Sequence, residues 1–206
     1  MSLWFRLFLK TRPYIGEYRQ QLLNFSKNLG FQLENIYVRD SKHSNAFAFG
    51  LWNKKCVTFN SFTLENHPWD EIEGCMAHEL GHHVNNGIYI YTALVSIILI
   101  VMSWINVTIY LSFHQNLFSL FLICVTTSAL LLPFISFFSR TMERQADNYA
   151  KKTLKDSSSF GRFLERMIEN EKKLGESIPK NPDLFTKIFF THPWFYDRIM
   201  LMKNNS

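Results

Sequence analysis

The sequence predicts an α+β protein that is mainly helical, with a small N-terminal β-sheet and a hairpin of two membrane-spanning helices. The hairpin is indicated by the stretch from Val84 to Ser139, which contains no Asp, Glu, Lys or Arg, because uncharged runs of this length are typical of transmembrane helices. The sheet is indicated by short β-branched and aromatic runs between residues 36 and 62, separated by turn residues. A chain of 206 residues is long enough for a core of ordinary size, so we expect residues 1–206 to form one domain.

The charged residues flank the apolar stretch on both sides. All 22 Lys and Arg lie outside it, and the formal net charge is +5. This distribution indicates a lipid bilayer as a partner and argues against nucleic acid. The chain has three cysteines, an odd number without a C-x-x-C pair, which indicates a reducing compartment and no disulfide framework.

The part before the apolar stretch predicts two helices with strands between them. Tyr18, Leu22 and Phe25 have helical spacing, and Gly30 follows as a stop. Pro68 and the acids after it suit the start of a second helix, through the fixed φ of proline and the helix dipole. We expect helices at 14–29 and 68–82, and strands at 36–38, 45–52 and 56–62 that form a hairpin or meander.

The apolar stretch divides into two spans, at 89–111 and 117–139, each about 34 Å long as a helix. The connector at 112–116 is too short for a domain, and Pro133 is expected to kink the second span. The alternative is a helical hairpin buried in a soluble protein, but the rest of the chain is too short to bury it. After the spans we expect helices at 140–155, 160–174 and 193–203, with a loop or short helix from 181.

The run His78-Glu79-Leu80-Gly81-His82 reads H-E-x-x-H. On a helix the two histidines lie one turn apart on one face, where they can hold one Zn²⁺ per chain. Glu79 then lies beside the open metal position and can accept a proton from a water that the metal activates. His83 lies about 100° round the helix and should miss the metal. The alternative is a chance match on a surface helix.

Catalytic zinc needs a third protein ligand, and Glu143 is the candidate. It directly follows the second span, and a hairpin returns the chain to the side it left, so Glu143 can meet His78 and His82. Asp147, one turn further on, can accept a hydrogen bond from the outer nitrogen of a zinc histidine. The alternative is that both acids form surface ion pairs with basic neighbours.

Four segments in this order resemble the M48 family of zinc metallopeptidases, which includes the Ste24-type CAAX prenyl proteases and the bacterial HtpX proteases. The segments are Ser44–Gly50, His78–His82, Glu143–Asp147, and Thr191-His-Pro with Arg198 after it. The resemblance covers residues 36–202. It implies a zincin-type catalytic domain of the gluzincin class, with the membrane hairpin inserted between the zinc-ligand helices.

The resemblance also implies roles for residues that carry no recognisable motif by themselves. It implies that His192 stabilises the oxyanion and that Arg198 pairs with the carboxylates of Glu143 and Asp147. It further implies that an extended peptide substrate adds along an edge strand, formed by Asn45, Ala46, Phe47 and Ala48. Taken alone, His192 would be a capping or surface histidine, and the strand could equally be a central one without a free edge.

The sequence departs from both branches of the family ahead of the edge strand. Those branches carry additional membrane spans there, whereas only 44 residues precede Asn45. We therefore expect no closed membrane chamber from this chain, and prenyl-CAAX specificity is not carried over. A homo-oligomer or a partner that supplies further membrane helices stays open.

Together these features predict an integral-membrane zinc endopeptidase with two spans that hydrolyses peptide bonds of membrane or membrane-proximal proteins. The positive-inside rule places both flanks and the active site on the cytoplasmic side. One alternative is a non-catalytic membrane adaptor with a structural zinc, against which the intact Glu79 argues. Another is a CAAX prenyl protease-like processing enzyme. A transporter or channel is disfavoured because the spans hold no ionisable residue.

Overall fold

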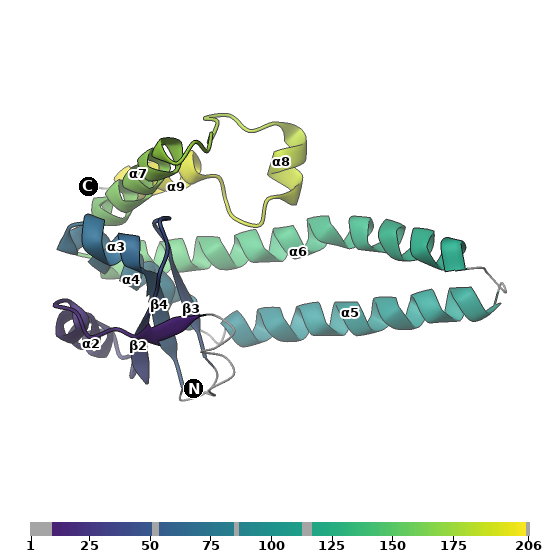
Figure 1. Cartoon of the computed structure of the whole chain (residues 1–206), viewed down its shortest axis with the longest axis horizontal. Coiled ribbons are helices and arrows are strands. Elements are labelled where there is room, and N and C mark those ends of the chain that lie inside the picture. Colours follow the sequence, from purple (N-terminus) through teal and green to yellow (C-terminus); the bar gives the residue numbers. More distant parts are fainter. Residues whose placement is uncertain (1–9, 51–53, 85–86, 113–116, 205–206) are drawn as a thin grey trace.

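The computed structural model describes residues 10–50, 54–84, 87–112 and 117–204. A small sheet and the helices around it form one end of the molecule, and two long helices extend from that end as a hairpin (Figure 1). The predicted mainly helical α+β architecture is confirmed. The hairpin connector at 113–116 lies outside the described residues.

The sheet has four strands in the order β1-β2-β4-β3. Their bounds are Thr11–Pro13 for β1, Asn35–Arg39 for β2, Ala46–Phe49 for β3 and Cys56–Asn60 for β4. β3 and β4 pair antiparallel, as predicted for a hairpin, whereas β2 and β4 run parallel. This order leaves β3 at one edge of the described sheet.

One strand of the sheet was not predicted, and several predicted bounds differ from the structure. The strand expected at 45–52 ends at Phe49, and positions 51 and 52 lie outside the described residues. Strand β1 was not predicted, because three residues carry no periodicity and its pairing with β2 joins distant parts of the chain. The first helix, α2, occupies Arg19–Asn28 and not 14–29, since Tyr14 continues the sheet by donating its backbone N–H to Ile36. The strand expected to reach residue 62 ends at Asn60, where the short helix α3, Ser61–Asn66, begins.

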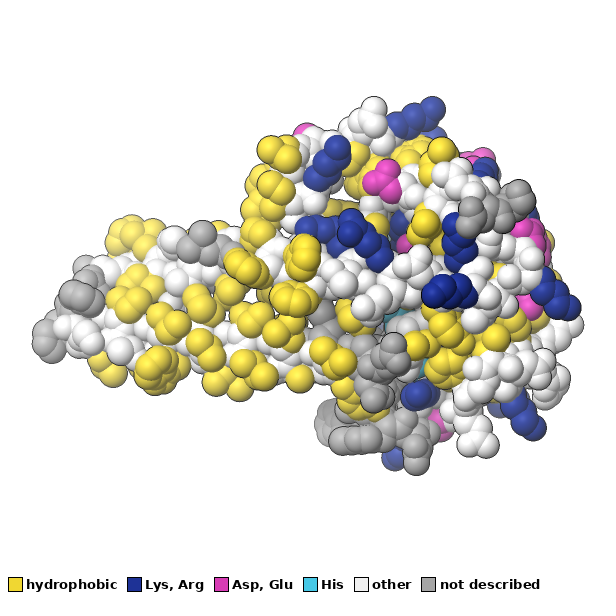
Figure 2. All heavy atoms as spheres, turned by 180° about the vertical axis from the view of Figure 1, so that it is seen from behind, with side chains coloured by type: hydrophobic (Ala, Val, Ile, Leu, Met, Phe, Trp, Pro, Cys, Tyr) yellow, Lys and Arg dark blue, Asp and Glu magenta, His cyan; other side chains and the backbone are white. Residues whose placement is uncertain are grey.

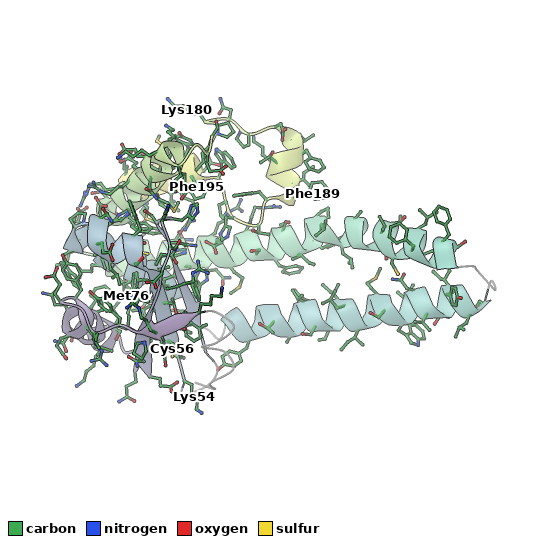
Figure 3. The ribbon with its side chains drawn as sticks, in the orientation of Figure 1. Lys54, Cys56, Met76, Lys180, Phe189 and Phe195 are labelled. Atoms are coloured by element: carbon green, nitrogen blue, oxygen red, sulfur yellow. The ribbon has the colours of Figure 1, made fainter. Side chains whose placement is uncertain are left out.

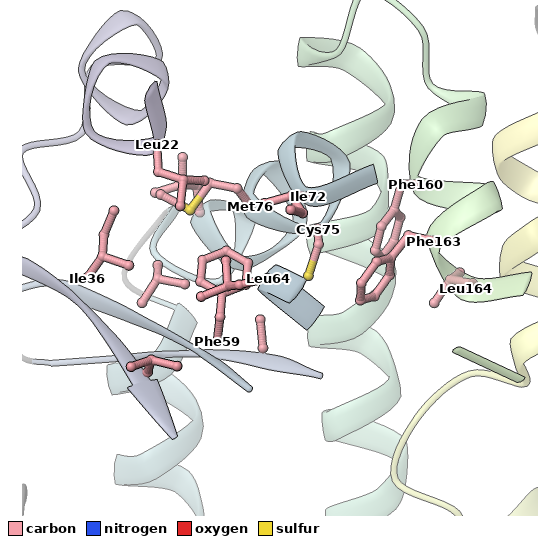
Figure 4. Packing of buried hydrophobic residues seen from close by; sticks show 14 of the residues in the cluster. Leu22, Ile36, Phe59, Leu64, Ile72, Cys75, Met76, Phe160, Phe163 and Leu164 are labelled. Atoms are coloured by element: carbon pink, nitrogen blue, oxygen red, sulfur yellow. The ribbon is translucent and has the colours of Figure 1, made fainter. Parts of the chain in front are cut away.

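Helix α4, Trp69–Gly81, is the central element of the core. Ile72, Cys75 and Met76 on this helix are almost fully buried. Figure 4 shows Met76 beside Leu22 of α2, with Phe160 of α7 (Ser158–Lys173) on the other side of α4. Because α4 is buried between the sheet and the later helices, its last turn is held rigidly where the H-E-x-x-H motif lies.

The hairpin consists of α5, Gly87–Ser112, and α6, Leu117–Thr153. Both contain stretches apolar and long enough to cross a membrane, and in the α5 stretch 0% of the residues are buried. Figure 2 shows hydrophobic side chains along the outside of this hairpin. The described part of the protein therefore does not bury this hairpin, in contrast to the alternative of a hairpin buried in a soluble core.

Helix α6 joins two predicted helices into one. The sequence predicts a span at 117–139 and a separate helix at 140–155, but α6 continues without a break to Thr153, with Pro133 inside it. No Gly and no further Pro interrupts the chain between Pro133 and Thr153. The consequence is that a single rigid element carries the chain from the apolar hairpin to Glu143 and Asp147.

After α7 the chain forms α8, Leu184–Phe189, and α9, Phe195–Lys203. Helix α9 packs against α7, whereas α8 lies beside α6 at the base of the hairpin (Figure 1). The last predicted helix begins two residues later than expected, at Phe195. The loop between α8 and α9 carries His192 toward the end of α4.

Candidate active site

Helices α4 and α6 pack closely together at Gly81, within the H-E-x-x-H motif. A Cβ added there would lie 2.7 Å from the Cα of Ala146 on α6, so only glycine fits without moving a backbone. This close approach brings His78 and His82 against Glu143 of α6.

The three predicted metal ligands converge with their ligand atoms facing one another. His78 Nε2 lies 3.2 Å from His82 Nε2 and 3.4 Å from a carboxylate oxygen of Glu143. His82 Nε2 lies 3.5 Å from the other Glu143 oxygen. Ligand atoms at about 2.0–2.2 Å from a tetrahedral zinc lie about 3.3–3.5 Å apart, so this group fits the ion without rearrangement. The three ligands leave a fourth position open.

The outer nitrogen of His78 is held by the carboxylate predicted for this purpose. His78 Nδ1 lies 2.9 Å from Oδ1 of Asp147, and Arg198 donates to both oxygens of Asp147 at 2.9 and 2.8 Å. An Nδ1–H that donates to Asp147 leaves Nε2 with a free lone pair for a metal. The ring of Phe160 stacks on His78 with centroids 4.9 Å apart, which fixes the plane of the imidazole.

Burial and charge give the site groups very different proton affinities when no metal is bound. Burial lowers the pKa of His78, but its hydrogen bonds with Asp147 and Glu143 outweigh this effect and raise it to about 9. Burial and the charge on His78 lower the pKa of His82 to about 4. Burial raises the pKa of Glu79 to about 7, which is the range in which a general base works well near neutral pH.

His192 and the ligand group line one cavity of about 780 Å³. Nδ1 of His192 lies 3.2 Å from Glu143, and the side chain is 47% exposed. The same cavity is lined by Asn45, Ala46, Phe47 and Ala48 of the predicted substrate strand. The structure thus brings the site residues predicted from sequence to a single cavity, with Asp147 and Arg198 directly behind His78.

Strand β3 presents backbone groups to this cavity. Asn45 accepts a hydrogen bond from the backbone N–H of Asn60 at 2.9 Å, so Asn45 faces β4. Backbone groups alternate in an antiparallel pair, and those of Ala46 and Ala48 therefore face the free edge. The Ala48 N–H reaches the carboxyl group of Glu79. A central strand without a free edge, the alternative that the sequence left open, is thus excluded for the described sheet.

A buried polar network behind the strand was missed by sequence reasoning, which assigned no role to His67. Nε2 of His67 lies 2.9 Å from the hydroxyl of Ser44, and Nδ1 lies 2.8 Å from Glu71. Arg166 of α7 donates to both oxygens of Glu71 at 2.8 and 3.0 Å. The network joins the residues before β3 to α4 and α7. Its only local signal is the i,i+4 spacing of His67 and Glu71.

His83 is turned away from the site, as its position on the helix predicts. Its Nε2 lies 3.3 Å from the backbone carbonyl of Cys56 in β4. Burial lowers its pKa to about 4, so it is neutral at ordinary pH. It packs α4 against the sheet and lies outside the group of His78, His82 and Glu143.

Comparison with known proteins agrees with this geometry. The chain is 31% identical over 230 residues to the probable CAAX prenyl protease 1 of Schizosaccharomyces pombe, covering 99% of this chain and 47% of that protein. It is 27% identical over 189 residues to the HtpX protease homolog of Helicobacter acinonychis, covering 83% of this chain and 60% of that protein. The chain thus spans about half the length of the curated relatives it matches.

The fold is shared with a solved structure. The crystal structure of Ste24p from S. mikatae superimposes with a TM-score of 0.77 at 24% identity, covering 98% of this chain and 54% of that one. The model of the family described as Peptidase family M48 matches residues 15–205. With its H-E-x-x-H helix, facing Glu143 and inserted hairpin all inside that match, the chain belongs to peptidase family M48.

Proposed function

We propose that this chain is a membrane-embedded zinc endopeptidase that hydrolyses peptide bonds of membrane or membrane-proximal proteins. The observation that carries the proposal is the spacing of the ligand atoms of His78, His82 and Glu143, beside the buried Glu79. These three side chains would hold one Zn²⁺ per chain. When bound, the metal would act as a Lewis acid on the scissile carbonyl and lower the pKa of water in its open position.

The residues around the metal position have separate tasks in this proposal. Glu79 accepts the proton of the attacking water and delivers it to the leaving amine, as its raised pKa permits. His192, which faces the cavity from the α8–α9 loop, donates a hydrogen bond to the oxyanion. Asp147 and Arg198 hold His78 in the tautomer and orientation that a ligand needs.

The substrate would bind as an added strand along the free edge of β3. Backbone pairing holds a peptide extended whatever its sequence, which suits an endopeptidase of broad specificity. Ala46 and Ala48 have small side chains and direct their backbone groups to that edge, next to Glu79. The scissile carbonyl of a peptide in this position would face the metal ligands.

We place residues 1–206 in one peptidase domain with two membrane spans, at 89–111 and 117–139. Both charged flanks would lie on the cytoplasmic side, where Lys and Arg are retained by the positive-inside rule. A second copy of the chain, or a partner protein that supplies further membrane helices, is compatible with this arrangement. A non-catalytic adaptor is less consistent with a buried Glu79, because a structural zinc site has no use for that acid.

A prenylated C-terminal peptide is the second substrate candidate. It is favoured by the resemblance to the probable CAAX prenyl protease 1 of S. pombe. It is also favoured by aromatic and aliphatic residues on the wall of the site cavity, among them Phe163, Leu164 and Met167. Cleavage of a prenylated and an unprenylated form of one peptide would separate the two candidates.

The proposal is tested by comparing two carboxylate variants. Glu79→Gln should keep zinc and lose cleavage of an unstructured protein by about 10²–10⁴-fold, because it removes only the base. Glu143→Ala should lose zinc, because it removes one of three protein ligands. Glu65→Gln, on an exposed carboxylate of α3, should change neither property. Full zinc content in Glu143→Ala, or wild-type cleavage in Glu79→Gln, would contradict the assignment.

A further inference from the structure

Helix α8 is fastened to α6 at the end of the apolar hairpin. Ser136 donates a hydrogen bond to the carbonyl of Phe189 at 2.9 Å, and Arg140 donates to the carbonyls of Ile188 and Phe190 at 3.0 and 2.8 Å. Figure 3 shows Phe189 at the end of α8 nearest to α6. Ser136 and Arg140 lie where the uncharged stretch ends, so α8 is fixed at the level where the second span would leave the membrane.

The outer face of α8 is apolar and uncovered. Leu184 is 73% exposed and Phe185 is 69% exposed, and none of the helix residues is buried. Phe137, on the adjoining part of α6, is 58% exposed. In Figure 2, hydrophobic side chains continue from the hairpin toward this part of the molecule. The apolar surface of α8 is therefore continuous with the surface that the bilayer would cover.

A basic cavity of about 560 Å³ lies between α6, α8 and the start of α9. Arg140, Arg144 and Lys187 line it, together with Asp147 and Asp197. Asp147 pairs with Arg198. The remaining charged side chains of the cavity are the three cations Arg140, Arg144 and Lys187 and one acid, Asp197. Among the described residues, Arg144 and Lys187 form no ion pair with a carboxylate. An apolar face with an uncompensated basic cavity beside it matches the two halves of an anionic lipid.

We propose that α8 lies in the membrane interface and that this cavity binds the phosphate-bearing headgroup of an anionic phospholipid. The inference rests on the proposed two-span membrane arrangement. Leu184 and Phe185 would contact the acyl region, while Arg144 and Lys187 donate charge-assisted hydrogen bonds to the phosphate.

The bound lipid would also reach the active site through one short loop. His192 lines both the basic cavity and the cavity that holds the metal ligands. Phe190, two residues earlier, is fixed to Arg140 through its carbonyl. A lipid bound to Arg144 and Lys187 would hold α8 against α6 and so keep His192 in place, and peptide cleavage should therefore depend on anionic lipid.

The experiment places the purified full-length protein in nanodiscs that contain a photoreactive acyl-chain analogue of either phosphatidylglycerol or phosphatidylcholine. Crosslinked peptides are then located by mass spectrometry. We expect the peptide 183–190 to be labelled several-fold more by phosphatidylglycerol than by phosphatidylcholine. The double variant Arg144→Gln with Lys187→Gln should lose this preference, so that both lipids label the peptide equally. Lys172→Gln with Lys173→Gln, which removes two exposed charges from α7, should retain it.

The outcomes separate the possible occupants. Equal labelling of 183–190 by both lipids would overturn headgroup recognition. Labelling of α5 and α6 without labelling of 183–190 would show that α8 is outside the membrane and that water or a protein covers it. Loss of the phosphatidylglycerol preference on adding inorganic phosphate would assign the cavity to free phosphate. Labelling of α5 and α6 tests the proposed membrane spans, and zinc content tests the proposed metal site, both independently of α8. If a variant does not fold, the comparison of the two lipids with the wild-type protein still tests the proposal.

Discussion

His78 lies between two carboxylates of the site, those of Asp147 and Glu143. Its Nδ1 faces Asp147, and its Nε2 faces both His82 and Glu143. Two carboxylates around one imidazole favour the protonated ring, and they raise the pKa of His78 to about 9 against the effect of burial. A metal ion at Nε2 would replace that proton with a larger positive charge, and the same carboxylates would then stabilise the metal.

We therefore predict that zinc binding to the metal-free protein releases protons at neutral pH. His78 has a raised pKa, so it is protonated at pH 7 and must lose its proton to bind a metal. Titration calorimetry in buffers of different ionisation enthalpy should report release of about one proton or more per zinc near pH 7. Release should decrease above pH 9, where His78 is already neutral. Observed heats that do not depend on the buffer near pH 7 would contradict the prediction.

The same raised pKa has a consequence for the stability of the metal-free protein. A group with a pKa of about 9 in the fold and an ordinary value of 6.5 when unfolded stabilises the fold fully below pH 6.5. That contribution is lost as the pH rises from 6.5 through 9. His83 acts in the opposite sense: its folded pKa of about 4 means that stability is lost as the pH falls from 6.5 toward 4.

At the scale of elements, the position of Gly81 sets how closely α4 and α6 pack. We predict that Gly81→Ala lowers zinc affinity and destabilises the protein by about 1–3 kcal/mol. The added Cβ meets backbone atoms of Ala146 at 2.7 and 3.0 Å, so the two helices must separate. Separation would carry His78 and His82 away from Glu143.

Gly161→Ala is the matched control for Gly81→Ala. In α7 an added Cβ would lie 3.3 Å from the side chain of Met202, a contact that a small shift relieves. The exchange of glycine for alanine in a helix should then be neutral or stabilising and leave zinc bound. Thermal unfolding and metal analysis of both variants decide the matter. A Gly81→Ala protein with wild-type zinc affinity would show that the close approach is not needed.

The edge position of β3 leads to a second prediction at this scale. Ala48→Pro should keep the sheet and the metal, because a proline is tolerated where the N–H faces away from the partner strand. Cleavage should fall by at least about tenfold, because the variant lacks the N–H that faces the substrate edge and Glu79. Ala48→Ser retains the N–H and should cleave peptide normally. Zinc content, melting temperature and peptide cleavage are the measurements. Wild-type cleavage by Ala48→Pro with zinc bound would rule out backbone pairing through this N–H.

At the scale of the whole molecule, the distribution of charge predicts the orientation in the membrane. A cysteine placed at Gln115, in a protein without Cys56, Cys75 and Cys124, should react with an impermeant thiol reagent added to intact cells. A cysteine in place of the exposed Lys172 should react only after lysis. The reverse pattern would place the peptidase site on the outer side.

Several features of this protein were predictable from the sequence because they depend on neighbouring residues. The H-E-x-x-H spacing puts His78 and His82 on one helical face. The uncharged stretch from Val84 to Ser139 gives the hairpin by its hydropathy and length. The β3–β4 hairpin follows from short strands separated by a turn. Glu143 was predicted as a site residue because it directly follows the second span, and a helical hairpin returns the chain to the side it left.

Only the tertiary structure decided the features that depend on contacts between distant segments. They include the pairing of β1 with β2, the edge position of β3, and the approach of the Ala48 N–H to the carboxyl group of Glu79. The network of Ser44, His67 and Glu71 has no local signal beyond one i,i+4 pair, because its hydroxyl and its arginine come from other parts of the chain. The basic cavity beside α8 exists only because α6, α8 and α9 meet there. Sequence periodicity reports which face of an element is apolar, whereas the free energy of packing and hydrogen bonding between elements determines what that face meets.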